Sequence, residues 1–175
     1  LSRCQVLELR PVATAMIVET LESRFELDQA RADEIARLSG GRPGWAMEAA
    51  ASPEVMEELS ERFDYLESLV SAGLERRFSY AADMAAGFGK RRESVYQELS
   101  LWLKWWRDLL LVKQGVPSFV TNLTRLEGLK SSAQAFSVGQ IAGAVESIDQ
   151  TLRHLERNVS PRLALESLML ALPRL

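Results

Sequence analysis

Apolar side chains recur at spacings of three and four positions along most of this 175-residue chain, and this period restricts its fold more than any other feature. Such spacing places apolar residues on one side of an α-helix, as for Ile17, Leu21 and Phe25. A strand-like alternation occurs only at residues 6–9. We therefore expect an all-α fold. The expected helices cover residues 12–25, 28–38, 45–51, 53–71, 72–86, 91–114, 123–135, 137–157 and a last segment from 160.

Residues that begin or end helices support these ranges. The side chains of Asp28 and Ser137 can accept hydrogen bonds from the first turn of a helix, and Gln140 lies at the spacing of a capping box after Ser137. Ser160 precedes a proline, which suits the first turn of the last helix. The glycine- and proline-containing segment 39–44 ends the second helix. These helix ends therefore have local chemical causes.

The segment Ala51-Ser52-Pro53 is the best candidate for a domain boundary, because a proline can open the next helix. We expect a three-helix domain at residues 10–52 and a larger helical domain at residues 53–175. Residues 1–9 are then the end of a preceding domain, since the chain begins with leucine in what reads as continuing structure. The boundary fits either a hinge or a rigid corner.

The composition excludes several classes of protein. A single cysteine, Cys4, cannot form an internal disulfide, and together with the single histidine, His154, it makes no zinc site. We expect no metal and no cofactor, and a surface position for His154. No apolar stretch approaches the roughly 20 residues that cross a bilayer, so we expect a cytoplasmic protein without membrane contact. The net charge of -3 argues against polyanion binding by bulk charge, and the basic groups Arg76-Arg77 and 90–92 are typical of solvated helix starts.

The helix expected at residues 91–114 carries an aromatic face, because Trp102, Trp105 and Trp106 lie at i, i+3 and i+4. The last helix is also unusually apolar and includes Leu168. Apolar faces of this size must be covered, either by the rest of the chain or by a partner. Stacking of the tryptophans on DNA bases is the less favoured interpretation.

Three separated motifs carry a family resemblance. The first is Ser2-Arg3-Cys4-Gln5, followed by an apolar-acidic-apolar stretch and Pro11. The second is residues 35–46, IARLSGGRPGWA, and the third is residues 158–166, NVSPRLALE, which run on to Leu172-Pro173. In this order they resemble the delta-prime subunit of the bacterial DNA polymerase III clamp loader, with the gamma/tau subunits as more distant relatives. The WRDLLL segment at 106–111 also resembles a collar helix of that family.

The resemblance implies a lid domain of the AAA+ type at residues 10–52, a collar domain at 53–175, and the end of an AAA+ core at 1–9. It implies a non-catalytic subunit in DNA replication, which assembles with gamma/tau and delta subunits into a hetero-pentamer that loads the sliding clamp on primed DNA. Arg3 would be an arginine finger directed at the ATP of a neighbouring subunit. The side chains expected at the subunit interface are Trp102, Trp105, Trp106, Leu168 and Leu172.

One position argues against an ATPase subunit. In the ATPase members of the wider family, an arginine that senses nucleotide begins the third lid helix. Here that position falls on Gly44, and Arg42 lies two residues earlier. The chain also contains no glycine-rich phosphate loop with its lysine and hydroxyl residue. We therefore favour a subunit that does not hydrolyse ATP. A gamma/tau-type ATPase subunit and an unrelated helical adaptor are the alternatives.

Overall fold

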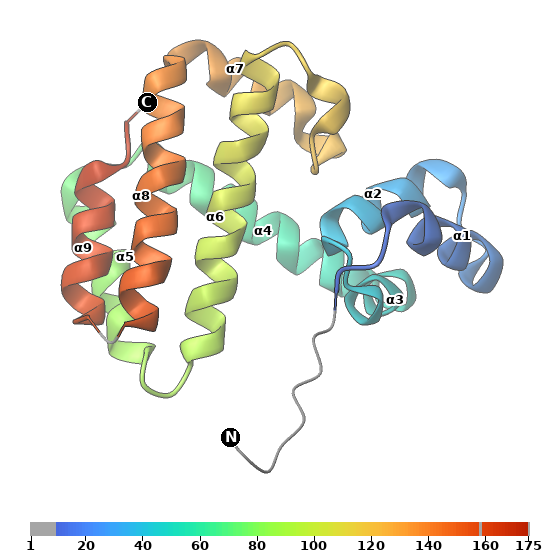
Figure 1. Ribbon diagram of the computed structural model, residues 1–175, viewed down its shortest axis with the longest axis horizontal. Helices are drawn as coiled ribbons and strands as arrows, with labels where there is room; N and C mark the ends of the chain where they lie inside the picture. The colour runs from blue at the N-terminus through green and yellow to red at the C-terminus, as the bar shows by residue number, and fades with distance from the viewer. Residues whose placement is uncertain (1–9, 158, 175) are drawn as a thin grey trace. The chain divides into compact units, whose positions relative to one another are not determined.

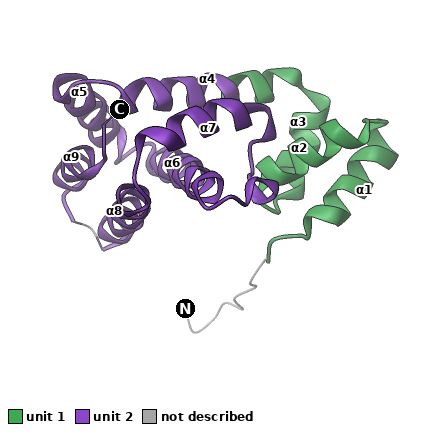
Figure 2. Cartoon of the chain, turned by 90° about the horizontal axis from the view of Figure 1, so that it is seen from above, with its two compact units in different colours: residues 1–58 green, residues 59–175 purple. Residues whose placement is uncertain are grey.

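The computed structural model describes residues 10–157 and 159–174, and these residues form helices and no strand. The all-α prediction is confirmed. The chain forms two compact units, the first ending at Glu58 and the second beginning at Leu59 (Figure 2). The division falls inside helix α4, Pro53–Val70, later than the expected boundary. The first turn of α4 belongs to the first unit because Val55 and Met56 pack against its core.

The first unit is built from three short helices, α1 at Thr14–Phe25, α2 at Gln29–Ser39 and α3 at Pro43–Ala51. All three pack against one another. Their shared core is made of small and aliphatic side chains. Its buried members are Ile17, Leu21, Ala32, Ile35, Ala36, Ala46 and Ala49.

The turn between α2 and α3 requires glycine. Gly41 has φ of 81°, and a Cβ atom there would lie 2.5 Å from the Cβ of Pro11. The close approach is held by a hydrogen bond from the N–H of Val12 to the carbonyl of Gly41, at 2.9 Å. A side chain at position 41 would therefore both strain the backbone and displace the segment that leads into α1.

The second unit contains the rest of α4 and the remaining helices (Figure 1). These are α5 at Leu74–Gly87, α6 at Arg92–Lys113, the short 3₁₀ helices η1 at Pro117–Phe119 and η2 at Leu123–Arg125, α7 at Leu126–Ala135, α8 at Val138–Glu156 and α9 at Pro161–Ala171. Helix α6 packs against α7 and α8, while α9 packs against α5 and α8. The long α6 therefore supplies many of the large side chains in the interior.

The predicted caps are present at the predicted residues. The N–H of Arg31 donates to Asp28 Oδ1 at 2.9 Å. The N–H of Gln140 donates to Ser137 Oγ at 3.2 Å, and the N–H of Ser137 donates to Gln140 Oε1 at 2.8 Å, so the capping box is complete. Each helix agrees with its predicted range to within a few residues, because these ends depend on short-range contacts.

Candidate functional site

The aromatic face of α6 is buried inside the second unit. Trp102, Trp105 and Trp106 are each at most 2% exposed. The Trp106 ring packs edge-on to that of Trp105, at a centroid distance of 5.0 Å, and lies 5.3 Å from the ring of Phe136. The Trp102 ring stacks on Tyr80 at 5.7 Å. The tryptophans therefore hold the helices of this unit together.

Two leucines of the last segment, Leu168 and Leu172, are also buried, at 1% and 5% exposure. The five side chains expected at a subunit interface thus have almost no surface to offer a partner. The interface and the residues that form it therefore stay a prediction. The sequence pattern located apolar faces correctly, and it could not show that other parts of the same chain cover them.

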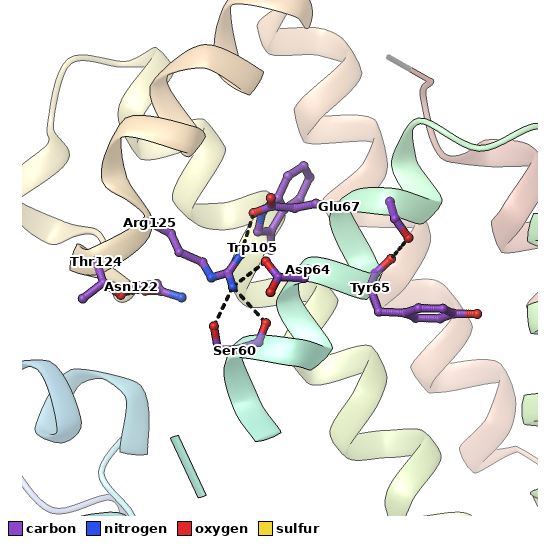
Figure 3. Close-up of polar contacts among 9 residues, drawn as sticks. Ser60, Asp64, Tyr65, Glu67, Trp105, Asn122, Thr124 and Arg125 are labelled. Carbon is purple, nitrogen blue, oxygen red and sulfur yellow. Dashed lines mark hydrogen bonds and ion pairs between the residues drawn. The ribbon is translucent and has the colours of Figure 1, made fainter. Parts of the chain in front are cut away.

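Arg125 is the centre of a polar cluster that fastens η2 to α4 (Figure 3). Its Nη2 donates to the carbonyl and to the hydroxyl of Ser60, both at 2.8 Å, and lies 2.7 Å from Asp64 Oδ1. Its Nη1 lies 3.4 Å from Glu67 Oε1, an oxygen that also accepts the indole N–H of Trp105 at 3.2 Å. The cluster therefore links the ion pairs of Arg125 to the buried Trp105. Nothing in the spacing of the sequence indicated this contact.

Arg77 has a structural role that corrects the sequence interpretation. The sequence predicts that both members of the pair Arg76-Arg77 are solvated, but Arg77 is only 3% exposed, whereas Arg76 is exposed. Burial is the largest cause that lowers the pKa of the Arg77 guanidinium, and the charge of Arg174 acts in the same direction.

The guanidinium of Arg77 donates to five backbone carbonyls at the C-terminal ends of α4 and α9. Its acceptors are Leu69, Val70, Met169, Leu172 and Pro173, at 2.8 to 3.2 Å. The last carbonyls of a helix have no partner within the helix and carry partial negative charge. Among the described residues no carboxylate pairs with this buried cation, and it is stable in this position because two such helix ends meet at it.

Asp108 ties α6 to the segment between η1 and η2. Its Oδ2 accepts the N–H of Thr121 at 3.0 Å and the N–H of Asn122 at 3.2 Å. Its Oδ1 is buried without a hydrogen-bond partner and lies 3.6 Å from Nη1 of Arg107. Desolvation raises the pKa of Asp108, and the two backbone hydrogen bonds oppose that rise.

Helix α9 has an exposed apolar stripe on the side opposite its buried leucines. Leu163 and Leu170 lie at i and i+7 and are each 61% exposed, and the exposed Ser167 lies between them. On the neighbouring helix α5, Leu74 is 52% exposed. It lies near the C-terminal end of α9 because Arg77, one turn after Leu74, donates to carbonyls there. We refer to Leu74, Leu163 and Leu170 together as the apolar surface, because they are exposed apolar side chains on two helices that pack against each other.

An open cleft lies between α5 and α6. Two adjoining cavities of about 230 and 480 Å³ share Asp83, Gly87 and Arg91 in their walls. At one side of the cleft, Tyr80 donates its hydroxyl to Glu98 Oε1 at 3.0 Å, and Arg62 donates to Glu98 Oε2 at 2.8 and 3.0 Å. Burial first, and then Glu98, raises the pKa of Tyr80. This hydroxyl is therefore a hydrogen-bond donor rather than a base.

The remaining residues discussed from the sequence are either not described or lie on the surface. Arg3 and Cys4 lie outside the described residues. Arg42 is exposed at the start of α3, where its Nε donates to the carbonyl of Ser39 at 3.0 Å. A Cβ on Gly44 would meet no atom within 4 Å, so close packing around the backbone does not require a glycine there. His154 is exposed on α8, as predicted.

Within residues 10–157 and 159–174, no three His, Cys, Asp or Glu side chains gather in a way that could hold a metal ion. The described helices also include none with the length and apolar character needed to span a membrane.

Comparison with known proteins matches the larger part of the chain to a protein family. Residues 57–173, which nearly coincide with the second unit, match the family model described as DNA polymerase III, delta subunit, C terminal. No curated protein and no solved structure matches the chain.

Proposed function

Because the chain belongs to the family of C-terminal domains of the DNA polymerase III delta subunit, we propose that it is a delta-prime-type member of the bacterial clamp loader and assembles through its second unit. The family match over residues 57–173 supports a subunit of this complex, and the order of the three sequence motifs supports delta-prime within it. The expected partners are gamma/tau and delta subunits in a cytoplasmic hetero-pentamer that loads the sliding clamp on primed DNA. The first unit would then be the lid.

The choice of delta-prime over gamma/tau rests on the start of α3. Gly44 occupies the position at which an ATPase subunit would have its nucleotide-sensing arginine, and Arg42 is already engaged with the Ser39 carbonyl. The subunit proposed here therefore does not hydrolyse ATP itself. It would act by holding the assembly together and by offering Arg3 to the ATP of a neighbour.

The apolar surface is the face we assign to the partner. Its leucines lie on α5 and α9, two helices that pack on each other, and their exposure contrasts with the burial of the five residues that the sequence predicts at the interface. Burying exposed leucines against another subunit would supply the hydrophobic contribution that stable assembly needs. Because these leucines are exposed, changing them should leave the fold of the chain intact.

Native mass spectrometry of the chain with gamma/tau and delta subunits tests the assembly. Incorporation of one copy into a hetero-pentamer is the expected result. The double substitution Leu163→Glu and Leu170→Glu should abolish incorporation, while the matched control Met16→Glu and Val138→Glu, also at exposed apolar positions, should keep it. If a folded wild-type chain binds neither partner, the proposal fails and an unrelated helical adaptor becomes the better interpretation.

The arginine finger has its own test in the full-length protein. In an assembled loader, Arg3→Ala should lower ATP hydrolysis at the neighbouring site by roughly a thousandfold or more if Arg3 completes that site. Arg10→Ala, at an exposed position of the same segment, is the control and should leave hydrolysis unchanged. Full hydrolysis by a correctly assembled loader that carries Arg3→Ala would remove Arg3 from the site.

A further inference from the structure

The end of the second unit at which α6 begins and α8 ends is basic, although the whole chain is acidic. Residues 88–93 and 153–157 contain five Lys and Arg residues against two Glu, a net charge of +3, whereas the chain as a whole has -3. The two segments are in contact, because Nη2 of Arg92 donates to the carbonyl of Leu155 at 3.1 Å (Figure 1). We name this the basic end.

Two of the five cations at the basic end are occupied by contacts within the chain. The Arg92 guanidinium also donates to the Tyr96 hydroxyl and lies over the rings of Phe88 and Tyr96. Arg153 forms an ion pair with Asp149, one turn earlier on α8. The charges of Arg92 and Arg153 are therefore engaged within the chain, in contrast to those of the other three cations.

The remaining three, Lys90, Arg91 and Arg157, are exposed and have no carboxylate within ion-pair distance in the part of the chain that the structure describes. Lys90 and Arg91 line the wider cavity of the α5–α6 cleft, so a ligand can approach both of them. The Arg91 guanidinium lies against Gly87, where a Cβ would come within 2.7 Å of its Nη2. A glycine at position 87 therefore leaves the space that this guanidinium uses.

We propose that the basic end binds the sugar-phosphate backbone of DNA directly, through Lys90, Arg91 and Arg157. Phosphates repeat along a strand, so a backbone can meet cations that come from separate helices, and such contacts need no base recognition. DNA is the polyanion that a member of this family works beside, and in this respect the inference builds on the proposed function. It goes beyond that function by giving the chain a direct contact with DNA.

The test is fluorescence anisotropy of a short fluorescein-labelled DNA duplex titrated with the chain over a range of salt concentrations. Three phosphate contacts predict that log K falls with log salt with a slope of about -2.7. The triple change Lys90→Gln, Arg91→Gln and Arg157→Gln should weaken binding roughly tenfold or more at low salt and bring the slope toward zero.

The matched control removes the same charge elsewhere, through Arg10→Gln, Lys130→Gln and Arg174→Gln, all at exposed positions. It should bind DNA within about twofold of the wild type and keep the salt slope. An equal loss in both variants would assign the binding to bulk charge and overturn the proposal. The proposal would also be overturned if the wild type bound no duplex at low salt. It would likewise be overturned if the basic end bound a polyglutamate peptide in place of DNA.

Native mass spectrometry on both variants separates this inference from the assembly on which it builds. The triple change at the basic end should still incorporate into the hetero-pentamer, because it leaves the apolar surface unchanged. Assembly without DNA binding would overturn the inference and leave the proposed function standing. DNA binding by a chain that fails to assemble would overturn the proposed function and leave the DNA contact standing.

Discussion

The two units differ in how their interiors are built. The core of the first unit is rich in alanine, with Ala32, Ala36, Ala46 and Ala49 allowing its short helices to approach closely. The second unit buries three tryptophans and also buries charged groups, Arg77 and Asp108, which bind backbone atoms at helix ends and connections. The first unit buries few polar groups, chiefly Ser39 at the end of α2, and depends mainly on close packing of small side chains. A larger one with irregular connections uses buried polar contacts to fix where its segments end.

The largest expected effect is the loss of a tryptophan from the second unit. Trp106 is fully buried, so Trp106→Ala should leave a cavity and lower the free energy of unfolding by about 3–5 kcal/mol, measured by denaturant unfolding. Phe119→Ala, at a side chain that is 65% exposed, is the control and should change it by less than about 0.5 kcal/mol. Similar losses in the two variants would contradict the difference in burial.

Removing the buried cation comes next. Arg77→Ala should lower the free energy of unfolding by roughly 2–4 kcal/mol, because it leaves the carbonyls of two helix ends unpaired away from water. Arg77→Lys should recover only part of the lost stability, since an ammonium group cannot reproduce the planar array of N–H donors of the guanidinium. Its neighbour Arg76 is exposed, and Arg76→Ala should cost less than about 1 kcal/mol. If both alanine variants were equally stable, Arg77 would not have the structural role assigned to it.

Overfilling the alanine core should affect the first unit alone. Ala46 is fully buried, so Ala46→Leu should cost about 1–3 kcal/mol. Amide hydrogen exchange is the measurement, because it resolves the two units, and faster exchange is expected only in α1 to α3. Ala15→Leu, at an exposed position of α1, should have little effect. Loss of protection throughout α6 and α8 would show that the units do not unfold separately.

The smallest effect concerns pH and Asp108. Burial raises the pKa of this carboxyl above its ordinary value of 3.8. Its contribution to stability is therefore fully present below that value and is lost as the pH rises through the raised pKa. Asp108→Asn keeps an oxygen that can accept from Thr121 and Asn122 but does not ionise. The wild type should thus lose stability relative to Asp108→Asn as pH rises through this window, measured by thermal unfolding at a series of pH values. A difference independent of pH would contradict the assignment.

The sequence by itself determined the helices and their caps, because these depend on residues within a few positions of one another. Asp28 and the Ser137–Gln140 pair cap the helices predicted for them, and the apolar period located the buried faces. The order of motifs also indicated a DNA polymerase III subunit, which the family match supports over residues 57–173.

Only the tertiary structure decided which apolar faces are covered by the chain and which cations are free. Trp106 has the same sequence pattern whether it meets Phe136 or a partner, and Arg77 cannot be told from its exposed neighbour Arg76 by sequence. Arg77 is buried because its guanidinium meets carbonyls more than 90 residues later in the chain. Contacts over such separations arise from the packing of whole helices, so no local pattern records them.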